Sequence, residues 1–191
     1  MIYLSGKIIP ELPAMKTPHI PNKLTGQVWA ADSGRFSRPH QYSDKAYLKW
    51  LLEQPSKETC LFATAPDVVG NAGETLRLSL PMLQPIRECG YKVAFVAQDG
   101  LECLDIPWEH FDCLFIGGTT EWKLSSYAAI IVSEAKRRGK WVHMGRVNSL
   151  KRLRYAASIG CDSADGTIIA YGPDLYTNKV IEWVKIVNEE K

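Results

Sequence analysis

Short runs of consecutive apolar residues recur along the chain, with enough sequence between them for a helix. The runs are continuous rather than alternating between apolar and polar, which is typical of strands covered on both faces of a sheet. We therefore expect seven strands, while an eighth is not evident. The expected strands are Ile2–Leu4, Val28–Ala31, Cys60–Ala65, Lys92–Ala97, Cys113–Ile116, Lys140–Met144 and Gly166–Ala170.

Between these runs, apolar residues recur every three or four positions, as they do on the buried face of a helix. The stretch 74–89 has this spacing but contains Pro81 and Pro85, so we expect a kinked or split helix there. The other expected helices cover 44–54, 122–138 with Gly139 at its end, a segment capped by Asn148 or Ser149, and 175–190.

Strands that alternate with helices form parallel sheets joined by right-handed crossovers. The fold class we expect is therefore α/β: a reduced, TIM-like (β/α)8 barrel, with an open doubly wound sheet as the alternative. Both architectures place functional groups at the carboxyl ends of the strands. The proline-rich segment 7–27 is expected to be irregular, and the length of 191 residues predicts a single domain over 1–191.

Composition narrows the classes of protein to consider. The net charge is only +2, which is no global sign of nucleic-acid binding, and no run approaches the roughly 20 apolar residues of a membrane span. The chain starts without the long apolar region of a signal peptide. Its five cysteines include no Cys-x-x-Cys pair. We therefore expect free thiols in a reducing, cytoplasmic compartment, with no metal site and no cofactor.

Polar residues and glycines follow the expected strands, at the edge where such folds place an active site. Two of them are aspartates near opposite ends of the chain: Asp32 follows the second strand, and Asp165 lies beside the last. If the strands close into a barrel, both carboxylates lie at one mouth. Two carboxylates facing one pocket are typical of glycosidic-bond chemistry, in which one attacks or stabilises the sugar carbon and the other moves protons.

Two motifs in this set are specific in combination: DSGxF at 32–36, and MG followed by GxDxxD within 144–165. The ordered set resembles the tRNA-guanine transglycosylase superfamily. It is most similar to the DNA-directed branch, the 7-deazapurine DNA transglycosylases (DpdA-type) of phages and bacterial modification islands. The resemblance covers roughly residues 29 to 167. It implies a TIM barrel that exchanges guanine for a 7-deazaguanine base, such as preQ0, through a covalent enzyme–sugar intermediate.

The resemblance also implies roles for individual residues. Asp165 matches the nucleophile that attacks C1′, and Asp32 matches the general acid and base. The base-binding positions are Asp67 and Gln98 at the purine edge, Gly118 with Thr119 as a backbone contact, and Phe36 and Met144 on the two faces of the ring. These residue types suit the chemistry, because a carboxylate and a carboxamide can pair with the amide and amino edge of guanine.

Basic residues near these motifs are candidates for nucleic-acid contacts, because lysine and arginine bind phosphate without reading sequence. A guanosine in a duplex has to leave the base stack before a pocket of this kind can reach C1′. A solvated helix face explains the basic stretch 136–154 equally well. The nucleic-acid-binding residues that we expect are Arg35, Arg38, Arg146, Lys151 and Arg152.

Several features depart from the family pattern. The cysteine and histidine cluster that binds zinc in the tRNA enzymes is missing, as is the arginine-containing loop after the nucleophile, and Arg35 replaces a glycine. Asp162 remains an alternative nucleophile to Asp165. We expect His143 to be a histidine whose hydrogen bonds are satisfied within the sheet.

The leading hypothesis is a transglycosylase that inserts a 7-deazaguanine base into DNA. One alternative is exchange on tRNA, or hydrolysis by an N-glycosidase. Another is a non-catalytic nucleic-acid-binding or partner subunit that keeps the barrel. A homodimer or a helper protein is compatible with each of these hypotheses.

Overall fold

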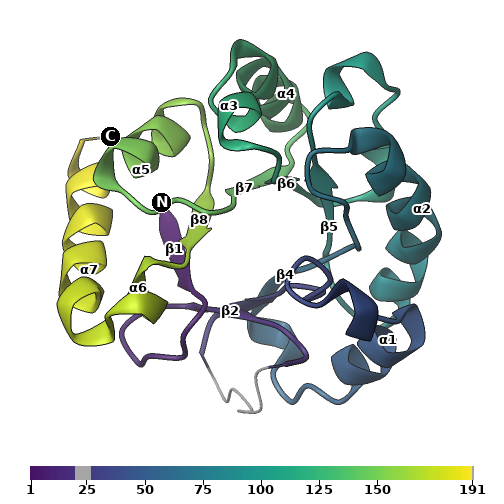
Figure 1. Ribbon diagram of the computed structural model, residues 1–191, viewed down its shortest axis with the longest axis horizontal. Coiled ribbons are helices and arrows are strands. Elements are labelled where there is room, and N and C mark those ends of the chain that lie inside the picture. Colours follow the sequence, from purple (N-terminus) through teal and green to yellow (C-terminus); the bar gives the residue numbers. More distant parts are fainter. Residues whose placement is uncertain (20–26, 191) are drawn as a thin grey trace.

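The computed structural model describes residues 1–19 and 27–190, which form a closed barrel of eight parallel strands (Figure 1). The strands neighbour one another in chain order, and β1 pairs with β8 to close the ring. This arrangement confirms the TIM-like α/β barrel, and the open doubly wound sheet is wrong. The strands are β1 (Ile2–Ser5), β2 (Ala14–Lys16), β3 (Trp29–Ala31), β4 (Cys60–Thr64), β5 (Val93–Ala97), β6 (Cys113–Ile116), β7 (Trp141–Met144) and β8 (Ser163–Gly166).

Helices surround the ring of strands and cover its outer face (Figure 1). Some crossovers lack an α-helix: the β1–β2 connection has no helix, and the β5–β6 connection has the short 3-10 segments η3 (Leu101–Cys103) and η4 (Trp108–His110). The barrel is therefore reduced in its outer layer rather than in its strands. The α-helices are α1 (Asp44–Leu52), α2 (Ala72–Glu88), α3 (Thr120–Lys123), α4 (Ser126–Arg137), α5 (Leu150–Ser158), α6 (Ile168–Tyr171) and α7 (Pro173–Glu189).

Side chains on the strands divide between two cores, because successive residues of a strand point to opposite faces of the sheet. The outer core lies between the strands and the helices, and the inner core fills the barrel. In β7, for example, Val142 and Met144 belong to the outer core, whereas Trp141 packs against the inner one. The inner core consists of Leu4, Met15, Ala30, Phe62, Ala94, Val96, Cys113 and Phe115.

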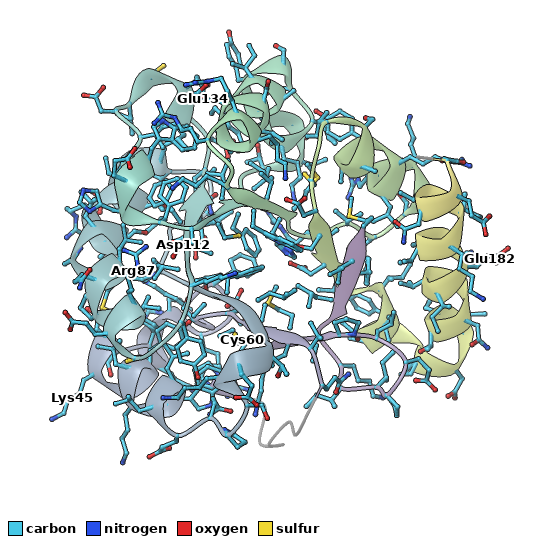
Figure 2. The ribbon with its side chains drawn as sticks, turned by 180° about the vertical axis from the view of Figure 1, so that it is seen from behind. Lys45, Cys60, Arg87, Asp112, Glu134 and Glu182 are labelled. Carbon is cyan, nitrogen blue, oxygen red and sulfur yellow. The ribbon has the colours of Figure 1, made fainter. Side chains whose placement is uncertain are left out.

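Two aspartates link helices to strands at the amino-terminal end of the barrel. Asp112, just before β6, accepts hydrogen bonds from the Arg87 guanidinium at the end of α2 (2.9 Å) and from the first backbone N–H of β5 (2.8 Å) (Figure 2). Asp162, just before β8, accepts hydrogen bonds from the Lys136 ammonium of α4 (2.7 Å) and from a backbone N–H of β7 (2.8 Å). Each carboxylate therefore ties a helix to the neighbouring strands.

Two strands differ from the expectation. The eighth strand is β2, which lies within the segment 7–27 that was expected to be irregular. The last strand is β8 rather than Gly166–Ala170, because the apolar residues after Gly166 form α6 instead. Periodicity alone cannot tell a short apolar run in a strand from one in a helix. Here the run packs against α7 and does not enter the sheet.

Two helices also differ from the expectation. The segment 122–138 is divided into α3 and α4, because the Ser125 hydroxyl caps α4 by accepting the Ala128 N–H. Helix α2 continues through both of its prolines. Pro81 is exposed and Pro85 is only half-buried, so both lie where water can bond to carbonyls that lose a helical partner. The cap of α5 is Ser149.

Two expectations from composition can be compared with the structure. Among residues 1–19 and 27–190, every helix is too short or too polar to cross a lipid bilayer. The cysteines are free thiols, as expected, and three of them are fully buried, whereas Cys60 is half-buried and Cys103 is exposed.

Candidate active site

A cavity of about 260 Å³ lies at the carboxyl ends of the strands. Residues at the end of every strand, or just after it, contribute to its wall, as in the active sites of other (β/α)8 barrels. Its polar side chains belong to Thr17, Asp32, Ser37, Thr64, Asp67, Gln98, Arg146, Asp165 and Thr167. The structure therefore brings together six of the residues expected from the sequence: Asp32, Phe36, Asp67, Gln98, Arg146 and Asp165.

Asp165 lies on β8 with its carboxylate in the cavity. Its Oδ2 is 2.9 Å from Nε2 of His143, and its Oδ1 accepts the backbone N–H of Arg146 at 3.2 Å. The two contacts fix the orientation of the carboxylate. Asp162, the alternative nucleophile, is bound to Lys136 at the opposite end of the barrel and does not line the cavity.

Asp32 lies directly after β3, in the turn of the DSGxF motif. Its Oδ1 accepts the N–H of Gly34 at 2.6 Å, and Gly34 adopts a left-handed φ of +72° that favours glycine. Burial raises the pKa of Asp32, the N–H of Gly34 acts in the opposite direction, and the carboxylate of Asp165 raises the pKa further. Asp32 can therefore hold a proton more readily than an ordinary aspartate, which suits a group that delivers a proton.

Asp67 and Gln98, which follow β4 and β5, form a pair across the barrel from Asp165. The Gln98 amide donates to Oδ2 of Asp67 at 2.6 Å, and its Oε1 accepts the N–H groups of Gly70 and Gly118. Gln98 is thus anchored and in turn holds Asp67. Burial is the main cause that raises the pKa of Asp67 to about 7; the nearby Asp32 adds to this rise, while Arg35 and Gln98 oppose it. Asp67 is the member of the pair that is better placed to meet a ligand.

Met144 does not form a wall of the cavity, which corrects the expectation. It is fully buried in the outer core, between the barrel and the helices. The cause is strand alternation: because His143 points into the barrel, its neighbour Met144 points outward. The apolar wall comes instead from Met15, Val96 and Phe115.

Gly118 and Thr119 also lie outside the cavity wall. The N–H of Gly118 donates to Gln98, and its carbonyl accepts the Arg146 guanidinium. Thr119 donates to Asp99 through both its N–H (2.8 Å) and its hydroxyl (2.5 Å). Both residues therefore shape the loop after β6, and the preceding residue, Gly117, reaches the cavity. The order of the strand ends in the sequence therefore predicted correctly that the loop after β6 reaches the cavity. It did not predict which residue of the loop lines the wall.

Phe36 and Arg146 form the mouth of the cavity. Phe36 is 60% exposed, and the Arg146 guanidinium lies 5.7 Å from the centre of its ring. Arg35 binds the backbone carbonyl of Asp67, which turns it toward the site. Arg38 is exposed, and its guanidinium donates to the Gln41 side chain at 3.4 Å. An aromatic face with a cation beside it is a platform on which a nucleobase can stack.

The basic stretch 136–154 divides into two parts. Four of its members are engaged away from the cavity: Lys136 by Asp162, Arg137 and Arg138 by Glu134, and Arg154 by Glu190. Arg146 lines the cavity, and Lys151 and Arg152 lie in the first turn of α5, which follows the same loop. A solvated helix face therefore explains Lys136, Arg137, Arg138 and Arg154. The candidate nucleic-acid contacts that remain in this stretch are Arg146, Lys151 and Arg152.

Some residues of the site were not foreseen from the sequence. Met15 and Phe115 line the cavity, and His143 contacts Asp165. The contact of His143 depends on the register of β7 and β8, in which His143 lies opposite Ser163. Residues 143 and 165 then point to the same side of the sheet. Met15 could not be placed without β2.

Neither a scan against protein-family models nor a search of the curated proteins finds a match to this chain. Within the part of the chain that the structure describes, no group of three or more His, Cys, Asp or Glu side chains is arranged to hold a metal ion. The sequence motifs and the geometry of the cavity are therefore the features from which a function can be inferred.

Proposed function

We propose that the protein is a transglycosylase that replaces guanine in DNA with a 7-deazaguanine base of the preQ0 type. The observation that carries the proposal is the pair of aspartates in one cavity with different surroundings. Asp165 is held by the His143 ring and by the backbone N–H of Arg146, whereas burial raises the pKa of Asp32. A carboxyl group with a raised pKa in the same cavity as a second, oriented carboxylate suits an acid that works with a nucleophile.

The proposed reaction has two displacements. In the first, a carboxylate oxygen of Asp165 bonds to C1′ as the bond from C1′ to guanine breaks, and Asp32 gives its proton to the departing base. In the second, the incoming base attacks C1′ and gives its proton to Asp32, and the electrons of the ester bond return to Asp165. One residue serves both proton transfers, because the second step is chemically the reverse of the first.

The base-binding role falls mainly to Asp67. When ionised, its carboxylate can accept hydrogen bonds from the N–H groups of a guanine-like edge, and Gln98 holds it in place at 2.6 Å. The cavity volume of about 260 Å³ is close to the lower limit of ordinary ligand pockets, about 300 Å³, which suits a flat heterocycle. The apolar side chains of Met15 and Phe115 can contact its faces.

The nucleic-acid substrate would be met at the mouth. Phe36 and Arg146 offer a stacking surface and a charge at the edge of the cavity, which suits a nucleotide that has left the base stack. The choice of DNA over tRNA follows the resemblance to the DNA-directed branch.

A base-exchange assay tests the proposal. Purified protein is given radiolabelled guanine or preQ0 with duplex DNA, single-stranded DNA or tRNA, and label in each nucleic acid is counted. The Asp165→Asn variant tests the nucleophile. The matched control is Asp162→Asn, which changes the same residue type three positions away at the opposite end of the barrel.

Label in DNA with the wild-type protein and with Asp162→Asn, but not with Asp165→Asn, is the expected result. Label in tRNA alone would mean that tRNA, and not DNA, is the substrate. Release of guanine without entry of label would indicate an N-glycosidase. Binding of preQ0 without turnover on any nucleic acid would favour a non-catalytic subunit.

A further inference from the structure

His143 has no part in either of the two proposed displacements. It is fully buried inside the barrel, and its ring packs against the rings of Phe62 and Phe115, with centroid separations of 5.1 and 4.5 Å. The two rings restrict the plane of the imidazole. Its two nitrogens are both engaged: Nδ1 is 2.8 Å from the Ser163 hydroxyl, and Nε2 is 2.9 Å from Oδ2 of Asp165.

The neighbours of Ser163 determine which nitrogen of His143 carries the proton. The Trp141 indole N–H is 2.9 Å from the Ser163 oxygen, and an indole nitrogen only donates, so this oxygen accepts from Trp141. Ser163 is fully buried, so its own proton needs an acceptor, and Nδ1 of His143 is in reach. Nδ1 then carries no proton, and Nε2–H donates to Asp165.

A doubly protonated His143 would disrupt this series of hydrogen bonds. Its Nδ1–H would donate to the Ser163 oxygen, which already accepts from Trp141. The hydroxyl proton of Ser163 would then be buried without its acceptor, and such a loss is costly. The order of donors therefore runs in one direction, from Trp141 through Ser163 and His143 to Asp165.

We propose that His143 is a positioning residue for Asp165. Trp141 and Ser163 hold the ring in its Nε2–H form, and this N–H fixes Oδ2 of the carboxylate while the backbone N–H of Arg146 fixes Oδ1. As far as catalysis is concerned, the inference rests on the proposed function. The same N–H stabilises the carboxylate both as it attacks C1′ and as it leaves, and His143 neither gains nor loses a proton in either displacement.

The first experiment does not depend on turnover. The full chain is labelled with ¹⁵N-histidine, and the nitrogen chemical shifts and one-bond couplings of its four histidines are measured. The His143 signals are identified by their loss in His143→Gln. We expect a neutral imidazole with its proton on Nε2, and mixed tautomers in Ser163→Ala. A proton on Nδ1, a doubly protonated ring, or no change in Ser163→Ala would overturn the chain of donors.

The second experiment measures base exchange with two replacements of the same ring. His143→Gln can keep an N–H close to the position of Nε2, whereas the shorter His143→Asn cannot reach Asp165. We expect His143→Asn to lower kcat by about 10²-fold with little change in KM for the base, and His143→Gln to recover part of this loss. Ser163→Ala should lower kcat by a smaller factor.

Tyr3→Phe is the matched control. Its hydroxyl donates to the Val147 carbonyl at 3.0 Å, so the change removes a buried hydrogen bond close to the site without touching the carboxylate. Equal kcat in His143→Asn, Tyr3→Phe and the wild type, with all three folded by circular dichroism, would overturn the positioning role. If the wild-type protein exchanges no base, the proposed function fails, while the tautomer measurement still decides whether the chain of donors exists.

Discussion

The two ends of the barrel use the same residue type in opposite ways. At the amino-terminal end, Asp112 and Asp162 are each bound by a cationic side chain and by a backbone N–H. At the carboxyl end, the hydrogen bonds to Asp32, Asp67 and Asp165 come from backbone N–H groups, an amide and a histidine. The first pair joins helices to strands, and the second group surrounds a cavity.

An aspartate therefore has different energetic consequences at the two ends. The ion pairs of Asp112 and Asp162 join helices to strands and stabilise the fold. Burial without such a partner instead raises the pKa values of Asp32 and Asp67, so the folded protein holds their charged forms less favourably than water does. Stabilising residues are typical of the amino-terminal end of (β/α)8 barrels, and reactive residues of the carboxyl end.

The largest expected effect contrasts two aspartates near β8. Asp165→Asn removes the anionic nucleophile and should lower the rate of base exchange by about 10⁴-fold or more. Asp162→Asn should leave kcat close to the wild-type value, because its side chain lies at the other end of the barrel. Incorporation of labelled base into DNA measures both rates. Similar losses in the two variants, while both are folded, would remove the distinction between the ends.

The next effect concerns stability and pH at the carboxyl end. Because the pKa of Asp67 is raised to about 7 in the folded protein, protonation of Asp67 contributes stability that is complete below a pH of about 4 and is lost as the pH rises through 7. Asp67→Asn keeps an acceptor for Gln98 but cannot ionise. We expect it to exceed the wild type by about 2–4 kcal/mol in free energy of unfolding at pH 8.

Urea denaturation at pH 5 and at pH 8 measures this difference. The expected sign is a wild-type protein that loses more stability than Asp67→Asn between the two pH values. If the two proteins lose the same amount, Asp67 ionises as easily in the folded protein as in the unfolded chain, and the proposed contrast between the ends is wrong for this residue.

A smaller effect is expected on stability at the amino-terminal end. Asp162→Asn weakens a half-exposed ion pair with Lys136 and a hydrogen bond to β7, which together are worth about 1–2 kcal/mol. The midpoint of thermal unfolding should fall by about 2–4 °C for each kcal/mol lost. Asp165→Asn should not lower it. If the midpoint of thermal unfolding falls further in Asp165→Asn than in Asp162→Asn, the amino-terminal end is not the one at which aspartates stabilise the fold.

The smallest effect separates the mouth from the outer helices. Arg146→Ala should weaken DNA binding and reduce the slope of log K against log salt by about one, since one phosphate contact is lost. Arg137→Ala should change neither quantity, because Arg137 is held by Glu134 on the outside of α4. Fluorescence anisotropy over a range of salt concentrations measures both. An equal change in slope for the two variants would mean that the nucleic acid does not bind at the mouth of the cavity.

Much of the fold could be predicted from the sequence because most of its strands are apolar on both faces. β5 and β6 are fully buried and read clearly as apolar runs. β2 has only three residues and one of them is a lysine, while β8 contains Asp165, so neither stands out from its hydrophobicity. In β8 the functional residue itself interrupts the apolar pattern that would have revealed the strand.

The candidate site could be predicted where the chain order of the strand ends was enough. Asp32 follows β3 and Asp165 lies on β8, with β1 and β2 between them in the ring, and both reach the cavity. The face to which a side chain points is a finer property, and it depends on the register of the strand. Met144 was therefore expected to face the base but lies in the outer core, and the contact of His143 with Asp165 was not foreseen.

The most direct test of the central claim is to trap the covalent intermediate. The protein is incubated with guanine-containing DNA in the absence of an incoming base, denatured, digested with protease and nuclease, and analysed by mass spectrometry. We predict a deoxyribosyl ester on Asp165 in the wild type and in Asp162→Asn, and none in Asp165→Asn. Base exchange that proceeds without an ester on Asp165, or with the ester on another residue, would contradict the account.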